Sequence, residues 1–246
     1  MSQESSLQKT LTNSFWKGME DVFTAIPAVV VRIRDGFQNL SIDVQPAINI
    51  KKEDGTVTQR PVILNVPVQM PCNREGGMTH NLSVGDPVFL MFSMVGIDLW
   101  KRGNGMPTTS SDFRKFDKKD CVAIPSPFPF SESVNRPDKH MWSHDPTDVV
   151  LFHGLGTPEE TEVRLHRGGG VTINTNQHVN VNANSVAVVA ESASLDVSTL
   201  DVASPDTQWV GNINYSGTLT INGVPYEAHI HSNGTRPDGN TGGVAN

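Results

Sequence analysis

The chain has 246 residues and a formal net charge of −7, because 26 aspartates and glutamates outnumber 19 lysines and arginines. This length suits one or two domains of ordinary size, and the acidic balance argues against general nucleic-acid binding. No lysine follows Lys139, and Arg236 is the only basic residue after Arg167. The second half is therefore poorly equipped to bind phosphates or carboxylates.

Two cysteines, Cys72 and Cys121, are too few for a disulfide-stapled secreted fold, so we expect free thiols. The N-terminus lacks the basic and apolar regions of a signal peptide. No apolar run approaches the roughly 20 residues of a membrane span. Any action on a membrane would therefore have to occur without a stable transmembrane segment.

Residues 1–24 are expected to hold an N-terminal helix, over residues 5–24, because apolar residues recur at every fourth position. This stripe consists of Leu7, Leu11, Phe15, Met19 and Phe23. A lone helix of this length is marginally stable. The stripe therefore requires a docking surface, either on its own domain or on a partner protein.

Residues 25–130 are predicted to form a small barrel of the oligonucleotide/oligosaccharide-binding (OB) type, because short strand patterns alternate with turns. The candidate strands are residues 28–33, 40–44, 62–68, 87–92 and 97–100. Glu53-Asp54-Gly55 is a turn signal between the second and third of these. Residues 104–145 are predicted to be irregular, and residues 131–162 to connect the barrel to the next part.

Residues 163–225 are predicted to form a triple-stranded β-helical shaft wound from three chains. Apolar residues occupy alternate positions, but their parity shifts along the segment, as bulges or corners would produce. The apolar positions are Val171, Ile173, Val179 and Val181, then Val186 and Val188, then Leu195 and Val197, then Leu200 and Val202. One chain would leave open strand edges, which three intertwined chains close. The alternative is a β-meander packed on the barrel.

Residues 226–246 are expected to form a metal-binding apex, because His229 and His231 alternate and so share one face of a strand. If three copies met on a threefold axis, six imidazole nitrogens would surround one point. Six nitrogen ligands suit an octahedral ion such as iron rather than a four-coordinate structural zinc.

Two regions carry a resemblance to a known family. The first comprises Asn65–Val68, Leu82–Phe92, Gly96–Trp100 and Lys118–Ile124, and the second is the shaft with its His229-Ile230-His231 end and glycine-rich tail. They resemble the central membrane-piercing spike proteins of contractile-tailed bacteriophage baseplates.

The resemblance implies a non-enzymatic homotrimer in the tail baseplate of the virion. Its N-terminal part would attach to the baseplate hub protein, and its C-terminal tip would meet the host outer membrane. One iron ion per trimer would be coordinated by six histidines, His229 and His231 of each chain. No nucleic acid partner is implied.

Other readings of the sequence have weaker support. A polysaccharide-degrading tailspike would need paired carboxylates and aromatic platforms, for which the shaft offers few aromatic residues beyond Trp209 and Tyr215. A spike tip of a bacterial contractile injection system would share the proposed mechanism. His140 and His144 are a minor candidate pair, and Glu159, Glu160 and Glu162 are expected to lie in a solvated turn. Gly168-Gly169-Gly170 is expected to be a flexible junction rather than a phosphate loop.

Overall fold

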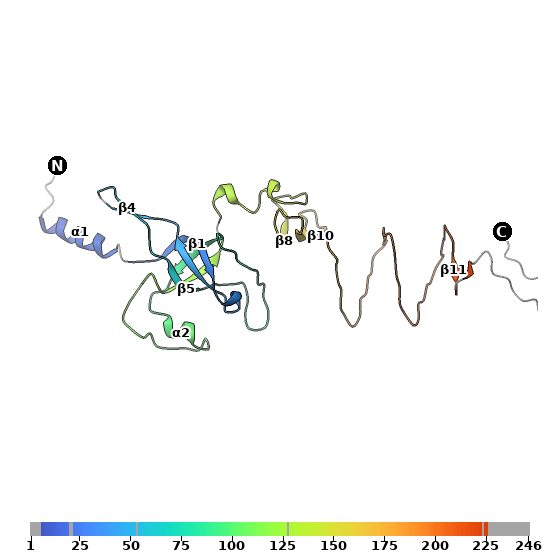
Figure 1. Ribbon diagram of the computed structural model, residues 1–246, viewed down its shortest axis with the longest axis horizontal. Helices are drawn as coiled ribbons and strands as arrows, with labels where there is room; N and C mark the ends of the chain where they lie inside the picture. Colours follow the sequence, from blue (N-terminus) through green and yellow to red (C-terminus); the bar gives the residue numbers. More distant parts are fainter. Residues whose placement is uncertain (1–5, 20–21, 53, 127, 223, 226–246) are drawn as a thin grey trace, which may run out of the picture. The chain divides into compact units, whose positions relative to one another are not determined.

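The computed structural model describes residues 6–19, 22–52, 54–126, 128–222 and 224–225. The chain divides into two units, residues 1–181 and residues 182–246. Strands far outnumber helices, which confirms the predicted all-β class with a short N-terminal helix (Figure 1). In the part of the chain that is described, no helix is long and apolar enough to cross a membrane.

Helix α1 (Ser6–Met19) is shorter than the predicted residues 5–24. Its apolar stripe is exposed, including Leu7, Leu11 and Phe15. The last residue of the predicted stripe, Phe23, belongs to the barrel instead. Its ring packs 5.3 Å from that of Phe92, between centroids, and its backbone N–H donates to the carbonyl of Phe116.

The first sheet contains five antiparallel strands in the order β5-β2-β1-β6-β7. These strands are β1 (Ala25–Ile33), β2 (Ser41–Pro46), β5 (Ile63–Pro67), β6 (Pro87–Phe92) and β7 (Cys121–Pro125). A parallel bridge joins Val68, just after β5, to Ala123 in β7, and the Gln69 N–H donates to the Ala123 carbonyl at 2.8 Å. The two edge strands therefore meet, as in a small partly open Greek-key barrel of the OB type.

The barrel core follows from strand alternation, because alternate side chains on a strand point to one face. Buried residues therefore come in pairs two apart, such as Val88 and Leu90 on β6 or Ile42 and Val44 on β2. Cys121 is buried in this core, Cys72 is exposed, and both are free thiols as predicted. Removing these apolar side chains from water supplies the main stabilisation of the barrel.

Residues 97–100 do not form the predicted strand, because helix α2 (Asp98–Arg102) occupies this position. The Asp120 carboxylate accepts the Ile97 N–H at 3.0 Å and holds the start of the helix. Asp98 in the first turn and Arg102 in the last turn match the helix dipole. The alternating pattern of these few residues is therefore outweighed by a contact with Asp120, which is distant along the chain.

The smaller elements flank the strands of the barrel. A short hairpin of β3 (Ile50–Lys51) and β4 (Val57–Thr58) surrounds the predicted turn. Three 3-10 turns, η1 (Asp35–Phe37), η2 (Phe130–Glu132) and η3 (Pro137–Lys139), interrupt the irregular stretches.

A second sheet is an antiparallel meander of β8 (Val149–His153), β9 (Thr161–Leu165) and β10 (Val171–Thr175). The predicted shaft boundary at residue 163 therefore falls within β9, and residues 163–175 pair inside one chain. Gly168, Gly169 and Gly170 form the β9–β10 hairpin turn rather than a flexible junction, and Gly169 has a φ of 95°. Reciprocal backbone bonds between His166 and the turn close the hairpin.

Residues 176–219 are extended and exposed, and Figure 1 draws them between β10 and β11 without strand arrows. Within this described segment no residue pairs in a strand or makes a backbone–backbone hydrogen bond. A two-residue hairpin of β11 (Thr220–Ile221) and β12 (Val224–Pro225) follows. The intertwined shaft needs more than one chain, so it stays a prediction.

Candidate functional site

The predicted metal ligands His229 and His231 lie outside the described residues. A polysaccharide-cleaving site in the shaft would have to use its carboxylates, which are Glu191, Asp196, Asp201 and Asp206, and all four are exposed.

A buried cluster of charged side chains lies on one face of β9 and of the residue before it, and it includes two glutamates that were expected in a solvated turn. Glu160, Glu162 and Arg164 are two residues apart, so they share a face, and each is at most 2% exposed. The expectation of a solvated turn is therefore wrong for Glu160 and Glu162. Residues 128–148, which precede β8, supply the side chains that cover this face.

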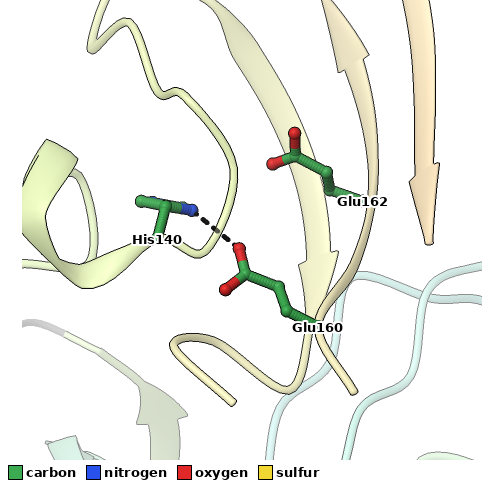
Figure 2. A group of neighbouring side chains, drawn as sticks. All are labelled: His140, Glu160 and Glu162. Carbon is green, nitrogen blue, oxygen red and sulfur yellow. Dashed lines mark hydrogen bonds and ion pairs between the residues drawn. The ribbon is translucent and has the colours of Figure 1, made fainter. Parts of the chain in front are cut away.

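The Glu160 carboxylate is the centre of the first half of the cluster. It accepts hydrogen bonds from the backbone N–H groups of Met141 at 2.9 Å and Gly156 at 2.6 Å. Figure 2 shows the His140 ring directed at this carboxylate, with Nδ1 3.1 Å from Oε1. The other ring nitrogen of His140 lies 2.9 Å from the carbonyl of Val134. Residues 140 and 141 are thus held to the start of β9 by charge-assisted hydrogen bonds to Glu160.

The second half of the cluster centres on Arg164. Its guanidinium donates to both oxygens of Glu162, at 2.7 and 2.9 Å, and pairs with Asp148 at 3.5 Å. Asn174 on β10 donates to Glu162 at 2.9 Å. Burial alone would raise the pKa of Glu162, but the Arg164 and Asn174 bonds outweigh it and lower that pKa.

His140 and His144, a minor candidate pair from the sequence, are brought together with their rings stacked 3.9 Å apart. Nε2 of His144 lies 2.9 Å from the Asn135 side-chain oxygen, whereas its Nδ1 is buried without a hydrogen-bond partner. Burial, followed by the neighbouring His140 and Arg164, lowers the pKa of His144.

His140, Glu160 and Glu162 could each offer one ligand atom to a metal ion, and these atoms lie within 4.8 Å of one another. Each of these side chains is already held by protein partners, and the Arg164 guanidinium contacts Glu162 directly. An ion would have to replace these bonds next to a fixed positive charge. We therefore assign the cluster a structural role.

A cavity of about 1150 Å³ opens at one end of the barrel. Apolar residues of its lining include Phe23, Ile26, Ile63 and Phe92, and its basic residues are Lys51, Lys52, Arg60, Lys115 and Lys118. Asp54 and Asp117 are its acidic residues, and both accept backbone N–H bonds. A lining that combines apolar side chains with an excess of positive charge suits an acidic protein surface.

The sequence analysis did not predict that the charged face of β9 is buried, although the sequence pattern shows that the strand has two different faces. Charged residues at 160, 162 and 164 alternate with apolar residues at 163 and 165. The pattern indicates a two-faced strand, but it does not say which face is covered. Only the contacts with residues 128–148 decide that.

Residues 26–126 match the family model described as the phage protein Gp138 N-terminal domain. The match extends from β1 to the residue after β7 and so coincides with the barrel. A comparison with curated proteins gave no match. The match and the all-β fold support a phage structural protein, and proteins of that class belong to the virion.

Proposed function

We propose that the protein is the trimeric spike at the tip of a contractile phage tail, driven through the host outer membrane by the sheath. The observation that carries this proposal is the segment of residues 177–222, here called the repeat segment. Its apolar side chains are exposed in one chain, including Val188 at 78% and Val202 at 63%. Such a segment requires cover from other chains.

The repeat segment bends at regular intervals. The bends fall at Asn176-Gln177, Asn184, Glu191, Ser198, Pro205, Gly211 and Gly217, so their spacing from Gln177 is seven residues and then six. The residues two and four positions after each bend are Val179 and Val181, Val186 and Val188, Ala193 and Leu195, Leu200 and Val202, Thr207 and Trp209, Ile213 and Tyr215, and Leu219 and Ile221. The spacing of seven reverses the parity at each bend from Asn184 to Pro205, which explains the parity shifts in the sequence, and the spacing of six keeps it after Pro205.

The last bends share one backbone geometry. Gly211 has a φ of 133° and Gly217 a φ of 132°, a region that residues with a side chain rarely adopt. Repeated bends with repeated apolar pairs support successive coils of one structure rather than an irregular loop. Three chains wound together would bury those pairs along the axis and satisfy the strand edges.

A shaft of this kind suits mechanical penetration. Its ladder bonds would run between chains, so three chains would have to separate together, which favours kinetic stability. The polar side chains that alternate with the apolar ones, such as Asn180, Asn182 and Asn214, would face solvent. Penetration would then depend on applied force, and the role is structural rather than enzymatic.

The tip would be closed by one iron ion per trimer, held by His229 and His231 of three chains. Imidazole nitrogens are suitable ligands for iron, and six of them complete an octahedral shell. The bound ion would supply a fixed crosslink between three chain ends. The two histidines of each chain would orient their rings to one side because they alternate along the strand.

The barrel end would bind the baseplate hub. The basic cavity and the exposed stripe of α1 support this assignment, because both are surfaces without cover from the described part of the chain. An acidic apolar segment of the hub has the chemistry that the cavity lining requires.

The test combines mass and metal content of the purified full chain. Light scattering at micromolar concentration should give three times the chain mass, and elemental analysis should give one iron per three chains. The double variant His229→Ala, His231→Ala should lose the metal and remain trimeric. A monomeric mass for the unaltered chain would refute the proposed spike, and one metal per chain would refute the shared axial site.

A further inference from the structure

The second sheet exposes an unusual face, here called the apolar face. It consists of Val149, Leu151, Val163, Leu165, Val171 and Ile173, which are between 36% and 67% exposed. An exposed cluster of large aliphatic residues on a small sheet marks an interaction surface.

Strand register makes this face continuous. Leu165 on the central strand pairs with Val149 on one side and Val171 on the other. Val163 pairs in the same way with Leu151 and Ile173. Directly opposed side chains on one face lie about 4.5–5.5 Å apart at Cβ, so the six residues form two parallel apolar rows.

The opposite face of this sheet is already covered by the chain itself. It carries Glu162 and Arg164, which are buried, and Phe152, whose ring meets that of His140 edge-on at 5.5 Å. Charged residues are therefore inside and aliphatic residues outside. A sheet with its polar face covered must bury the apolar face elsewhere.

We propose that the apolar faces of three copies of this chain pack against one another and form the base of the trimer. This inference rests on the proposed trimeric spike and adds the surface through which the three chains meet at its base. The repeat described above indicates that copies of the same chain cover this face. Val171 and Ile173 stand two and four residues after Gly169, the positive-φ turn residue of the hairpin. They thus occupy the same positions as the apolar pairs after each bend of the repeat segment.

The chemistry of the face also fits a copy of itself. All six side chains are uncharged and aliphatic, so identical faces can pack without burying an unpaired charge. The next row across the sheet is polar, with His153 and Thr175 on either side of Thr161. Thr161 and Thr175 are joined by a hydroxyl–hydroxyl hydrogen bond of 3.0 Å. This row marks the limit of the apolar face.

Thiol accessibility tests the proposal in the full chain. Leu151→Cys places a thiol on the apolar face, and Val57→Cys places one on the barrel hairpin. The two native side chains are similarly exposed within one chain, at 57% and 61%. Both variants carry Cys72→Ser, because Cys72 is exposed. Cys121 can stay, since burial raises its pKa to about 11 and keeps it protonated.

We expect maleimide to label Leu151→Cys at least tenfold more slowly than Val57→Cys in the native trimer, and at the same rate in denaturant. Ile173→Cys, on a neighbouring strand of the same face, should give the same protection and guards against a local defect at residue 151. Circular dichroism and light scattering confirm that each variant is folded and establish its mass.

Two outcomes would overturn the inference. A trimer in which residues 151 and 173 react as fast as residue 57 would leave the spike proposal standing and show that the apolar face is free. A monomer by light scattering, with equal labelling at all three positions, would refute the trimeric spike together with the inference.

Discussion

Arg164 illustrates how a single residue controls the second sheet. It is 2% exposed and is the buried cation that contacts both Glu162 and Asp148. A buried carboxylate is tolerated only when a partner and hydrogen bonds compensate for lost hydration. The guanidinium therefore maintains the burial of the charged face.

Arg164→Met should destabilise the folded chain by about 3–5 kcal/mol, because it leaves buried carboxylates without their cation. The matched control is Arg136→Met, which removes an ion pair with Asp138 at an exposed site. That change should leave the stability nearly unchanged, because ion pairs between exposed side chains contribute little. Urea unfolding monitored by circular dichroism measures both, and equal losses would contradict the structural role of the cluster.

The same cluster predicts a loss of stability in acid. The pKa of Asp148 is lowered mainly by the Arg167 N–H bond, and that of Glu162 is lowered by Arg164 and Asn174 despite burial. Lowered carboxyl pKa values stabilise the fold above the ordinary values of 3.8 and 4.5, and this stability is lost as pH falls through the folded values. Burial also lowers the pKa of His144 from 6.5, so its neutral form is favoured in the fold.

We therefore expect the thermal midpoint to fall in two stages on acidification, first below pH 6.5 and again below about pH 4.5. His144→Gln should remove the first stage, because a neutral amide replaces the titrating ring. The slope from one such group is at most about 1.4 kcal/mol per pH unit. Calorimetry from about pH 2 to pH 8 measures both stages, because the carboxyl pKa values are lowered from 3.8 and 4.5. An unchanged first stage in the variant would exclude His144 as its source.

At the scale of elements, the boundary between α1 and the barrel is decided by Phe23. The residue continues the four-residue spacing of the helix, yet its ring packs on Phe92 and on the guanidinium of Arg60. An aromatic ring gains more free energy in the barrel than on an exposed helix face. The helix can therefore be removed only as far as Met19 without disturbing the barrel.

Under the proposed spike function, deletion of residues 1–19 should leave the barrel and the trimer intact and impair incorporation into baseplates. Deletion of residues 1–24 should in addition lower the thermal midpoint, because it removes the Phe23 ring from the barrel. Differential scanning fluorimetry and quantitative immunoblots of assembled tails measure the two effects. Normal incorporation after the shorter deletion would refute a docking role for α1.

At the scale of the whole molecule, residues 128–148 belong with the sheet that follows them. Residues 128–148 supply His140, His144 and Trp142, which contact Glu160 or stack within the buried cluster. A cut immediately before β8 would expose the charged face of β9. The barrel has its own closed core, so a cut after β7 would expose much less.

Residues 128–246 alone should fold and trimerise, whereas residues 147–246 should fail to form the second sheet, because Glu160, Glu162 and Arg164 would lose their cover. Far-ultraviolet circular dichroism and sedimentation compare the two fragments at equal concentration. If the shorter fragment were as stable as the longer one, residues 128–146 would be dispensable for the second sheet.

Much of the fold is visible in the sequence where periodicity is strong and local. The pattern over residues 87–92 predicts β6, and four-residue spacing predicts α1. Residues 97–100 are too few for alternation to outweigh capping by Asp120, so the helix there could not be foreseen. The His229 and His231 apex was inferred from spacing alone and stays a prediction.

The sequence by itself determined which residues of β9 and of the repeat segment share a face, because the side-chain period of extended chain is a local property. It could not determine which face is buried. On β9 only the tertiary structure placed Glu162 and Arg164 inside, through contacts with residues 128–148 that are distant along the chain. Burial depends on what packs against a face, and that information lies outside any short window of sequence.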